Sequence, residues 1–373
     1  MKVGIITYHS SHNYGSMLQA YALSFFLKSK GFDVEIIDFR SPKQLRLYKH
    51  PLSPFAFNKH YFKRYLLSFV HPQWLYHECK KWSIYEKFVT DCLPVTQKRY
   101  KTWESVLKDL KNLQYDVVIS GGDQIWNMQG LHFDKAYYLD GEMDGIRKVS
   151  YSPSFGGVFL KRIKKEEQVF IKRALADYSS ISVREVAMKD YLEPVLNMKV
   201  EVTVDPTLLL SADDYKGLFQ EEPLVKGQYI FYYSPFENSK AEELAILYGK
   251  YKGLKVVTSF PHIKDNKGML VIHEAGPSEF LNLLKNATMV IGRSFHLIVF
   301  SLIYHKDFIV LDGAEDARMK DILHNVGLID RGRINHDNYM ELTLPTIDSD
   351  KIDAFLSEQR QKSAEFLLNS LVG

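Results

Sequence analysis

A guanidinium, a hydroxyl and an imidazole lie close together in the segment Arg293-Ser294-Phe295-His296, which follows the apolar run 289–291 after one glycine. An apolar run, a short polar turn and a second apolar segment predict a strand, a tight turn and the start of a helix. Open α/β sheets bind their ligands at the carboxyl ends of the strands. Arginine binds anions bidentately and histidine transfers protons near neutral pH, so this segment predicts a site where an anionic substrate undergoes proton transfer.

His296 has two interpretations. A helix that begins after Ser294 would carry free N–H groups and a partial positive charge beside His296, and both favour an anionic ligand and a neutral imidazole. Alternatively, His296 only caps or packs the helix, and Arg293 pairs with a surface carboxylate, which is a weak interaction. The residues alone leave both open.

Further candidates follow other apolar runs. Arg184 lies at the end of the expected strand 180–185, and an arginine there would share a cleft with Arg293 if the two segments belong to facing domains. Hydrogen-bonding or conformationally free residues follow the apolar runs 3–7 and 116–120: Asn13, Tyr14, Gly15, Gln19, Asp123 and Asn127. Asn and Gly are also ordinary turn formers, Asp123 either accepts a sugar hydroxyl proton or caps a helix that begins at Gln124, and Asp205 before Pro206 predicts a turn.

Composition limits the class of protein. The 373 residues include 46% hydrophobic and 25% charged ones, typical of a globular chain long enough for two domains. A net charge of +3, from 48 basic and 45 acidic residues, does not favour nucleic acid as a partner. Cys79 and Cys92 form no zinc-type spacing, which favours a reducing cytoplasm. His9 and His12 lack ligand partners at metal spacing, so no metal site is expected.

Membrane contact, where present, is expected to be peripheral. The N-terminus enters a strand pattern directly, without the apolar region of a signal peptide. The longest nearly apolar run, 295–304, is well short of the roughly 20 residues that cross a bilayer.

Strands and helices are expected to alternate. In the first half the expected strands are 3–7, 34–39, 116–120, 148–154, 180–185 and 200–204, with helices at 16–30, 103–113 and 164–178. In the second half the expected strands are 229–233, 255–260, 269–273, 289–291 and 308–311, with helices at 239–252, 278–286, 295–304 and 352–371. This pattern predicts an α/β protein with two Rossmann-like, doubly wound domains that face a cleft. GxGxxG is absent, and Ser16 with Gln19 fits a capping box.

The expected domains are 1–205 and 206–345, followed by a C-terminal helical segment, 346–373, that packs back across the interface. A helical insertion at about 43–101 carries 12 Lys or Arg against 3 Asp or Glu, with 13 aromatic residues, and is interrupted by Pro54 and three other prolines. It is expected to pack against the first domain, because aromatic residues at mixed spacing usually pack inward. The alternative is a patch that touches anionic lipid head groups or a lipid-linked sugar.

Taken together, the motifs resemble the polysaccharide pyruvyl transferase family in the same order. They are NYG at 13–15, LQAYAL at 18–23, GDQIWN at 122–127, SVRE at 182–185, VDPT at 204–207 and SFH at 294–296. Where the family has Arg-x-His, this chain has Ser294-Phe295-His296, with Arg293 one place earlier.

The resemblance implies a GT-B-like fold and an enzyme, a transferase that moves a pyruvyl group from phosphoenolpyruvate to a sugar as a cyclic ketal. The acceptor would be a surface polysaccharide or its lipid-linked precursor, and no cofactor would be required. It also implies that Arg184 and the segment around Ser294 bind the donor and that His296 acts as general acid. The methylene carbon of the donor must gain a proton during this reaction, so an acid within hydrogen-bond reach is chemically necessary.

Two other functions stay open at this point. One is a sugar-nucleotide-dependent glycosyltransferase on the same fold, which would bind a nucleotide sugar and ignore phosphoenolpyruvate. The other is a non-catalytic glycan-binding relative, which would bind sugar but neither donor. The enzyme is expected in the cytoplasm, either free or in peripheral contact with the inner face of the membrane.

Overall fold

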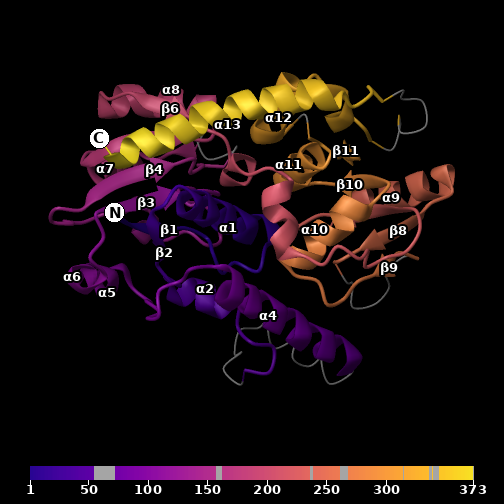
Figure 1. Ribbon diagram of the computed structural model, residues 1–373, viewed down its shortest axis with the longest axis horizontal. Helices are drawn as coiled ribbons and strands as arrows, with labels where there is room; N and C mark the ends of the chain where they lie inside the picture. The colour runs from indigo at the N-terminus through magenta and orange to yellow at the C-terminus, as the bar shows by residue number, and fades with distance from the viewer. Residues whose placement is uncertain are drawn as a thin grey trace. The chain divides into compact units, whose positions relative to one another are not determined.

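The structure is a computed structural model that describes residues 1–53, 72–156, 162–235, 238–260, 268–313, 315–335, 338 and 344–372. The chain divides into two compact units (Figure 1). The first unit comprises Met1–Tyr48, Val89–Leu210 and Ala354–Gly373, and the second comprises Lys49–Phe88 and Ser211–Asp353. Each unit contains one parallel sheet, which confirms the expected two-domain α/β fold.

The first unit has a six-stranded sheet in the order β2-β1-β3-β4-β5-β6. Its strands are β1 (Lys2–Ile6), β2 (Asp33–Ile36), β3 (Val117–Gly121), β4 (Arg147–Tyr151), β5 (Tyr178–Val183) and β6 (Val200–Val202). All neighbouring pairs are parallel. Because β1 lies between β2 and β3, the order reverses between β1 and β3, and loops after these two strands border a ligand crevice in doubly wound sheets.

The second unit has a five-stranded parallel sheet in the order β11-β10-β7-β8-β9. Its strands are β7 (Tyr229–Tyr233), β8 (Lys255–Thr258), β9 (Leu270–Val271), β10 (Met289–Gly292) and β11 (Asp307–Val310). Here the order reverses between β7 and β10. The expected Arg293-to-His296 segment therefore follows a strand at the reversal point of its own sheet.

Helices connect the strands in both units. Those of the first unit are α1 (Tyr14–Ser29), α2 (Pro42–Leu47), α5 (Trp103–Leu107), α6 (Leu110–Leu113), α7 (Lys165–Leu175) and α8 (Val186–Leu196), with the 3-10 helices η1 (Lys135–Tyr138) and η3 (Pro206–Leu209). Those of the second unit are α9 (Ser239–Lys252), α10 (Pro277–Asn286), α11 (Phe295–Ile303) and α12 (Ala317–Asn325), with η4 (Asp213–Leu218) and η5 (Ile329–Gly332). Two helices, α4 (Pro72–Cys92) and α13 (Ser349–Val372), have residues in both units.

The first helix begins earlier than its sequence predicts. The side chain of Asn13 accepts a hydrogen bond from the Ser16 backbone N–H at 3.2 Å, so Asn13 is the N-cap of α1. The Gln19 amide, expected to complete a capping box with Ser16, instead donates to the Thr7 hydroxyl and to the Ser16 carbonyl, both at 2.8 Å. The predicted box is therefore wrong, because Gln19 lies in the buried interior where Thr7 offers it an acceptor.

The limits of the units differ from the expected domain limits. The first unit continues from 205 to Leu210, because η3 packs against α1 and the Arg360 guanidinium donates to the carbonyls of Leu208 and Leu210. In the expected insertion 43–101, residues 72–88 group with the second unit rather than the first, through contacts such as Lys81 Nζ to the Ser259 carbonyl at 3.5 Å. Residues 54–71, including Pro54, lie outside the described residues.

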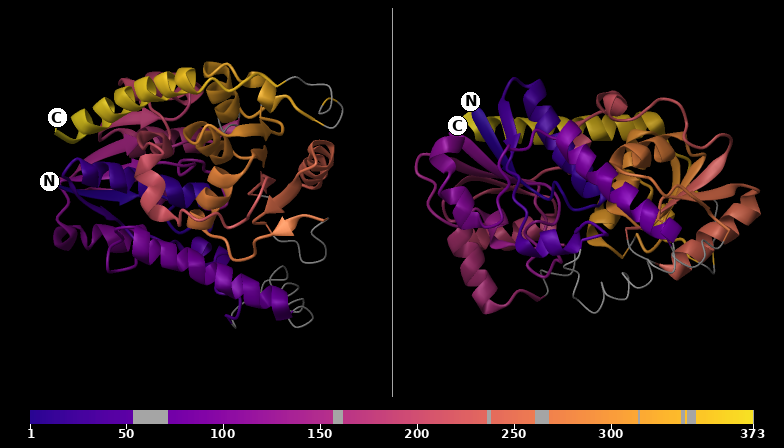
Figure 2. Two further views of the ribbon diagram at one scale, coloured as in Figure 1. Left: turned by 45° about the vertical axis from the view of Figure 1, so that its right-hand side comes forward. Right: turned by 90° about the horizontal axis from the view of Figure 1, so that it is seen from below.

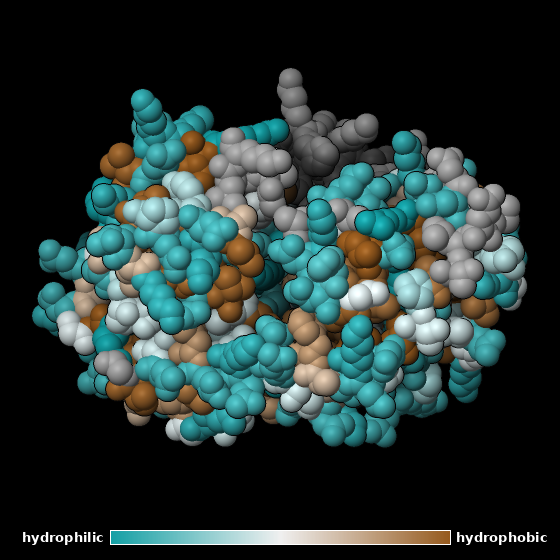
Figure 3. Space-filling model, turned by 90° about the horizontal axis from the view of Figure 1, so that it is seen from above, coloured by the Kyte–Doolittle hydropathy of each residue, from teal (hydrophilic) through white to brown (hydrophobic). Residues whose placement is uncertain are grey.

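The C-terminal helix belongs to the first unit from Ala354 onward. It lies alongside β4 and β6, and the same arrangement is visible from two further directions (Figures 1 and 2). The Ser363 hydroxyl accepts from the Val204 backbone N–H at 3.0 Å, and Arg147 donates to the Leu371 carbonyl. Figure 3 shows one face of the molecule, on which hydrophilic residues predominate and hydrophobic ones form small groups. Among the described helices, none combines the length and apolar character needed to span a bilayer.

Candidate active site

The expected acceptor residues of the first unit lie at the carboxyl ends of β1 and β3. Asn13 caps α1, and Ser16, in the first turn of that helix, donates its hydroxyl hydrogen to Asp123 Oδ2 in a very short bond. Asp123 Oδ1 also accepts from the Gln124 backbone N–H at 2.7 Å. The structure thus brings Asn13 and Asp123 together through Ser16, which was expected only to cap the helix.

Gln19 and Gly122 also meet at this edge of the sheet. Gly122 has a φ of +70°, and a Cβ added there would lie 1.7 Å from Gln19 Oε1, so only glycine fits without displacing the buried amide. Tyr14 and Gly15, expected in the same site, are buried in the first turn of α1. Asn127 lies further along the loop, where its Nδ2 donates to Gln124 Oε1 at 3.3 Å.

Asp123 does not cap a helix. The segment after it is a turn in the structure, and Asp123 has a φ of +55°, in the left-handed region that side chains rarely adopt. Of the two expected interpretations of Asp123, the cap of a helix starting at Gln124 is therefore wrong. The residue is only 9% exposed, so its carboxylate is held at the end of β3 rather than on the surface.

Rings gather beside this carboxylate, and the sequence did not single them out as a group. The Tyr48 hydroxyl hydrogen-bonds to His132 Nε2 at 2.9 Å, and the two rings are stacked at 5.3 Å between centroids. The His12 ring lies 4.8 Å from Tyr48, and Tyr8 lies edge-on to His132 at 5.4 Å. Burial first, and then the Lys43 charge, lower the pKa of His132, although the Asp123 charge raises it.

His9 lies in a second polar cluster, beyond the end of β2. Its Nε2 is 2.9 Å from Asp38 Oδ1, and Asp38 also accepts from Arg40 Nε at 2.7 Å and from Arg99 Nε at 3.0 Å. Burial raises the pKa of Asp38, but the bonds and charges of His9 and Arg40 outweigh it and hold this pKa well below its ordinary value. This carboxylate therefore serves as a buried counter-ion. Across the described residues, no three His, Cys, Asp or Glu side chains form a group that could hold a metal ion.

Arg184 is paired with a buried carboxylate. It follows β5, and its Nη2 lies 2.5 Å from Asp205 Oδ2. The two side chains are 4% and 0% exposed. Asp205 Oδ1 accepts from both the backbone N–H and the hydroxyl of Thr207, at 2.9 and 2.5 Å. The expected turn at Asp205 is present as the cap of η3, but the residue also holds the guanidinium expected to bind the donor, a role its sequence context did not predict.

The remaining candidates lie in the second unit, at the end of β10. Ser294 is the N-cap residue of α11 but makes no side-chain capping bond, and His296 is buried in the first turn of that helix. Arg293 is about half exposed and lies 3.5 Å from Asp312 Oδ2, which is the surface pairing considered as its alternative role. A Cβ on Gly292 would lie 1.8 Å from the Tyr233 carbonyl, so this glycine permits the close approach of β10 to β7 that brings the segment to the strand ends.

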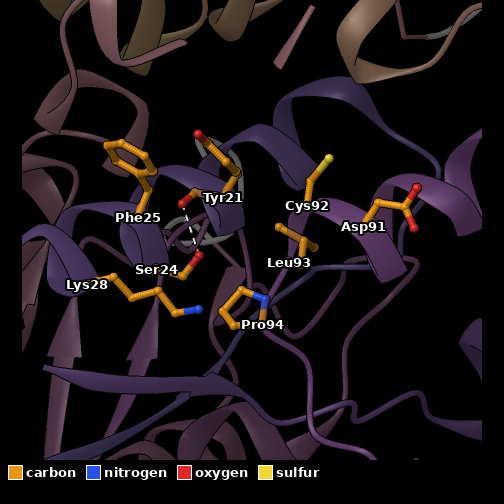
Figure 4. Close-up of a pocket in the computed structure, with 8 residues that line it drawn as sticks. All are labelled: Tyr21, Ser24, Phe25, Lys28, Asp91, Cys92, Leu93 and Pro94. Carbon is orange, nitrogen blue, oxygen red and sulfur yellow. Dashed lines mark hydrogen bonds between the residues drawn. The ribbon is translucent and has the colours of Figure 1, made fainter. Parts of the chain in front are cut away.

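The cavities found in the first unit do not contain these residues. One of about 280 Å³ lies between α1 and the end of α4 (Figure 4) and is lined by Tyr21, Ser24, Phe25, Lys28, Asp91, Cys92, Leu93 and Pro94. Another of about 740 Å³ lies between β5, β6 and α13. In each unit the candidate residues are therefore defined by their chemistry and by the reversal point of their own sheet, rather than by cavity size.

Comparison with known structures supports the fold. The UDP-GlcNAc 2-epimerase of Methanocaldococcus jannaschii has a TM-score of 0.51 and 14% identity over 96% of this chain and 99% of that chain. A putative UDP-N-acetylglucosamine 2-epimerase of Listeria monocytogenes has a TM-score of 0.50 and 11% identity over 98% and 90%. At such identities the likeness concerns the two-domain GT-B-like fold alone.

Comparison with proteins of curated function gave no significant match. The model of one transferase family, in contrast, matches residues 13–314, which contain every residue expected from the sequence to bind the donor or acceptor or to act as the acid. The chain belongs to the polysaccharide pyruvyl transferase family.

Proposed function

We propose that the protein transfers a pyruvyl group from phosphoenolpyruvate to two hydroxyls of a sugar and forms a cyclic ketal. The acceptor is a surface polysaccharide or its lipid-linked precursor, reached in the cytoplasm or by peripheral contact with the inner face of the membrane. The observation that carries the proposal is the position of His296, in the first turn of α11 at the end of β10 and inside the family match. The reaction as written requires no metal or other cofactor.

His296 is the proposed general acid. It adds a proton to the methylene carbon C3 of the donor, which makes C2 electrophilic. The first sugar hydroxyl attacks C2, the bond from C2 to the phosphate oxygen breaks, and the second hydroxyl then attacks C2. Of the two hydroxyl protons, one replaces the proton that His296 supplied and the other leaves with phosphate. The free N–H groups at the start of α11 favour the anionic donor beside the imidazole.

Arg184, Arg293 and Ser294 are the proposed donor ligands. Phosphoenolpyruvate carries a carboxylate and a phosphate, and the planar guanidinium can bind either group through two parallel hydrogen bonds. Arg184 is held in one orientation by Asp205, which suits a ligand that must be bound without reorganisation. Arg293 is the more exposed of the two, and its surface pair with Asp312 is weak enough for a donor phosphate to replace it.

The polar residues at the ends of β1 and β3 are the proposed acceptor site. Asn13, Gln19, Asp123 and Asn127 offer carboxylate and amide groups for sugar hydroxyls, and Tyr14 and Gly15 shape the start of α1 beside them. Holding the two hydroxyls near C2 would make the attack effectively intramolecular.

The test is phosphate release from phosphoenolpyruvate with a panel of saccharide acceptors, with ketal formation verified by mass spectrometry. His296→Ala is expected to lower acceptor-dependent phosphate release by about 10²–10⁴-fold, the usual contribution of a positioned acid. His324→Ala, an exposed histidine in the last turn of α12, is the matched control and should keep wild-type activity. Wild-type phosphate release by the His296 variant would contradict the assigned role.

Donor binding separates the proposal from the other two functions. Calorimetry should show binding of phosphoenolpyruvate and none of nucleotide sugars. Binding of a nucleotide sugar without a response to phosphoenolpyruvate would replace the proposal with a glycosyltransferase. Binding of saccharide alone, with no transfer from either donor, would point to a glycan-binding protein.

A further inference from the structure

Asp123 has an unusual backbone conformation for a residue other than glycine. Its φ of +55° follows the +70° of Gly122, so two consecutive left-handed residues end β3. A side chain is strained in this region, and such strain is concentrated at functional sites. The consequence is geometric, because the turn points the chain back toward the first turn of α1, where Ser16 meets the carboxylate.

The Asp123 carboxylate is held firmly but retains capacity for a ligand. Oδ2 accepts from the Ser16 hydroxyl and Oδ1 from the Gln124 backbone N–H, while the Asp123 carbonyl accepts from the Ser154 backbone N–H at 2.8 Å. An ionised carboxylate has about four acceptor positions. The described residues fill two of them, so a sugar hydroxyl can still donate to either oxygen.

Three titratable groups that interact with Asp123 are uncharged at neutral pH, although Lys43 lies close to one of them, His132. Burial first, then the neighbouring Tyr137 and the Asp123 charge, raise the pKa of Tyr8 well above its ordinary value, and burial does the same for Tyr137. Burial lowers the pKa of His132, so its imidazole is neutral. The Tyr8 hydroxyl is buried and has no hydrogen-bond partner within the described ranges, a cost that a bound hydroxyl would relieve.

Two other buried aspartates at the same edge of the sheet differ in this respect. Asp38 is surrounded by His9 and two arginines, and Asp205 pairs with Arg184. Asp123 has hydroxyl and amide N–H partners but forms no ion pair with the part of the chain that is described. An arginine at hydrogen-bond distance lowers the proton affinity of a carboxylate, and Asp123 has no such neighbour among the described residues.

We infer that Asp123 is the general base that takes the proton of the attacking sugar hydroxyl, and that Ser16 positions its carboxylate. The inference rests on the proposed function for the identity of the electrophile, C2 of phosphoenolpyruvate. As the hydroxyl O–H bond breaks, its oxygen bonds to C2 and the proton moves to Asp123. The C2–phosphate bond then breaks, phosphate takes the electron pair, and Asp123 returns the proton to the leaving phosphate.

The test compares Asp123→Asn with wild type over a range of pH. Asparagine keeps the shape and tolerates the left-handed backbone but cannot accept the proton. We expect kcat to fall by about 10²–10⁴-fold, with little change in the acceptor KM and with loss of the acidic limb of the kcat profile. A purely structural role would leave that limb in place. Asp144→Asn is the matched control, because Asp144 is exposed and precedes β4, at the amino ends of the strands, whereas Asp123 lies at their carboxyl ends.

Ser16→Ala tests the positioning role. Loss of a hydrogen bond to the charged carboxylate raises its pKa, so the acidic limb should remain but move to higher pH. If Asp123→Asn does not fold, Asp123→Gly decides the question, since glycine suits the φ of +55° and added formate should restore part of its activity. Unchanged kcat with an unchanged acidic limb in the Asn variant, or no effect of formate on an inactive Gly variant, would overturn the inference.

Different results would contradict the role of Asp123 and the proposed pyruvyl transfer. If wild type transfers from a nucleotide sugar and not from phosphoenolpyruvate, the proposed function is wrong. The same comparison of Asp123→Asn with wild type, made with that donor, then decides whether Asp123 is the base. If wild type transfers from neither donor, both are overturned.

Discussion

Replacement of Asp205 by Asn is expected to destabilise the first unit strongly. The Asp205 and Arg184 side chains are 0% and 4% exposed and lie 2.5 Å apart, so the substitution leaves a buried guanidinium without its counter-charge. Breaking such a pair costs about 3–5 kcal/mol, and at about 2–4 °C per kcal/mol the first unit should melt roughly 6–20 °C lower. Asparagine still accepts from the Thr207 backbone N–H, so the loss reports mainly on the charge.

Thermal and urea unfolding with probes in each unit measure this effect, since the two units are expected to unfold in separable transitions. Asp140→Asn is the matched control. Asp140 pairs with Arg173 on the surface of the same unit, with side chains 28% and 65% exposed, and its loss should cost at most about 1 kcal/mol.

The double variant Arg184→Met with Asp205→Asn tests whether the unpaired buried charge causes the loss of stability. Removing both charges leaves no buried ion, so the double variant should be more stable than Asp205→Asn alone. If the two single effects simply add, or if Asp205→Asn costs less than about 1 kcal/mol, the pair does not stabilise the first unit as its burial implies.

Three further variants test the site and its surroundings. The pKa of Asp38 is held below its ordinary value, so this carboxylate stabilises the fold fully above about pH 4 and loses that contribution at lower pH. In Asp38→Asn the urea midpoint should therefore fall less steeply between neutral and acidic pH than in wild type. The same fall in both proteins would contradict this. Burial, then the imidazole stacked on it and a nearby lysine, lower the pKa of His273, so the second unit should lose stability below about pH 6.5, and His273→Gln should reduce that loss in melts from pH 7.5 to 5. Gly122→Ala should lose about 1–2 kcal/mol of stability from a side chain in the left-handed region, and more because the new Cβ displaces Gln19. Gly145→Ala, at a φ of +73° with nothing within 4 Å of its Cβ, should show only the backbone cost. Equal urea midpoints for the two variants would show that the Gln19 amide moves aside without cost.

Short-range sequence patterns predicted the strands and most of the helix starts. Apolar runs followed by small or polar residues located the strands of both sheets, because parallel strands buried on both faces are continuously apolar. The same logic located His296 in the first turn of α11, since the signal for a helix start lies within a few residues. Among the described α-helices outside the expected insertion, α8 and α12 were not predicted. One of them, α8, has Pro194 in its last turn, where a proline ordinarily ends a helical pattern.

Contacts between distant segments could not be predicted in the same way. Ser16 and Asn13 are both good N-cap residues, and the choice between them depends on whether Gln19 finds an acceptor, which Thr7 supplies from the end of β1. Arg184 and Asp205 form their ion pair because β5 and β6 are neighbours in the sheet, and neither sequence segment predicts which strands are neighbours. The order of the strands across a sheet depends on the whole sheet, so side-chain pairs between neighbouring strands could not be predicted from either segment alone.

Three aspartates show why residue type alone does not assign a chemical role. Asp38, Asp123 and Asp205 all follow apolar runs, and all three are buried in the first unit. Their partners come from other segments: arginines and an imidazole for the first, a serine hydroxyl for the second and a guanidinium for the third. A carboxylate between cations stabilises the fold as their counter-ion, and the adjacent cations lower its proton affinity. Asp123, bonded to a hydroxyl and an amide N–H, forms no ion pair with the described residues. Chemistry at this edge of the sheet is therefore decided by which neighbours the fold supplies, and it favours Asp123 as the carboxylate that reacts.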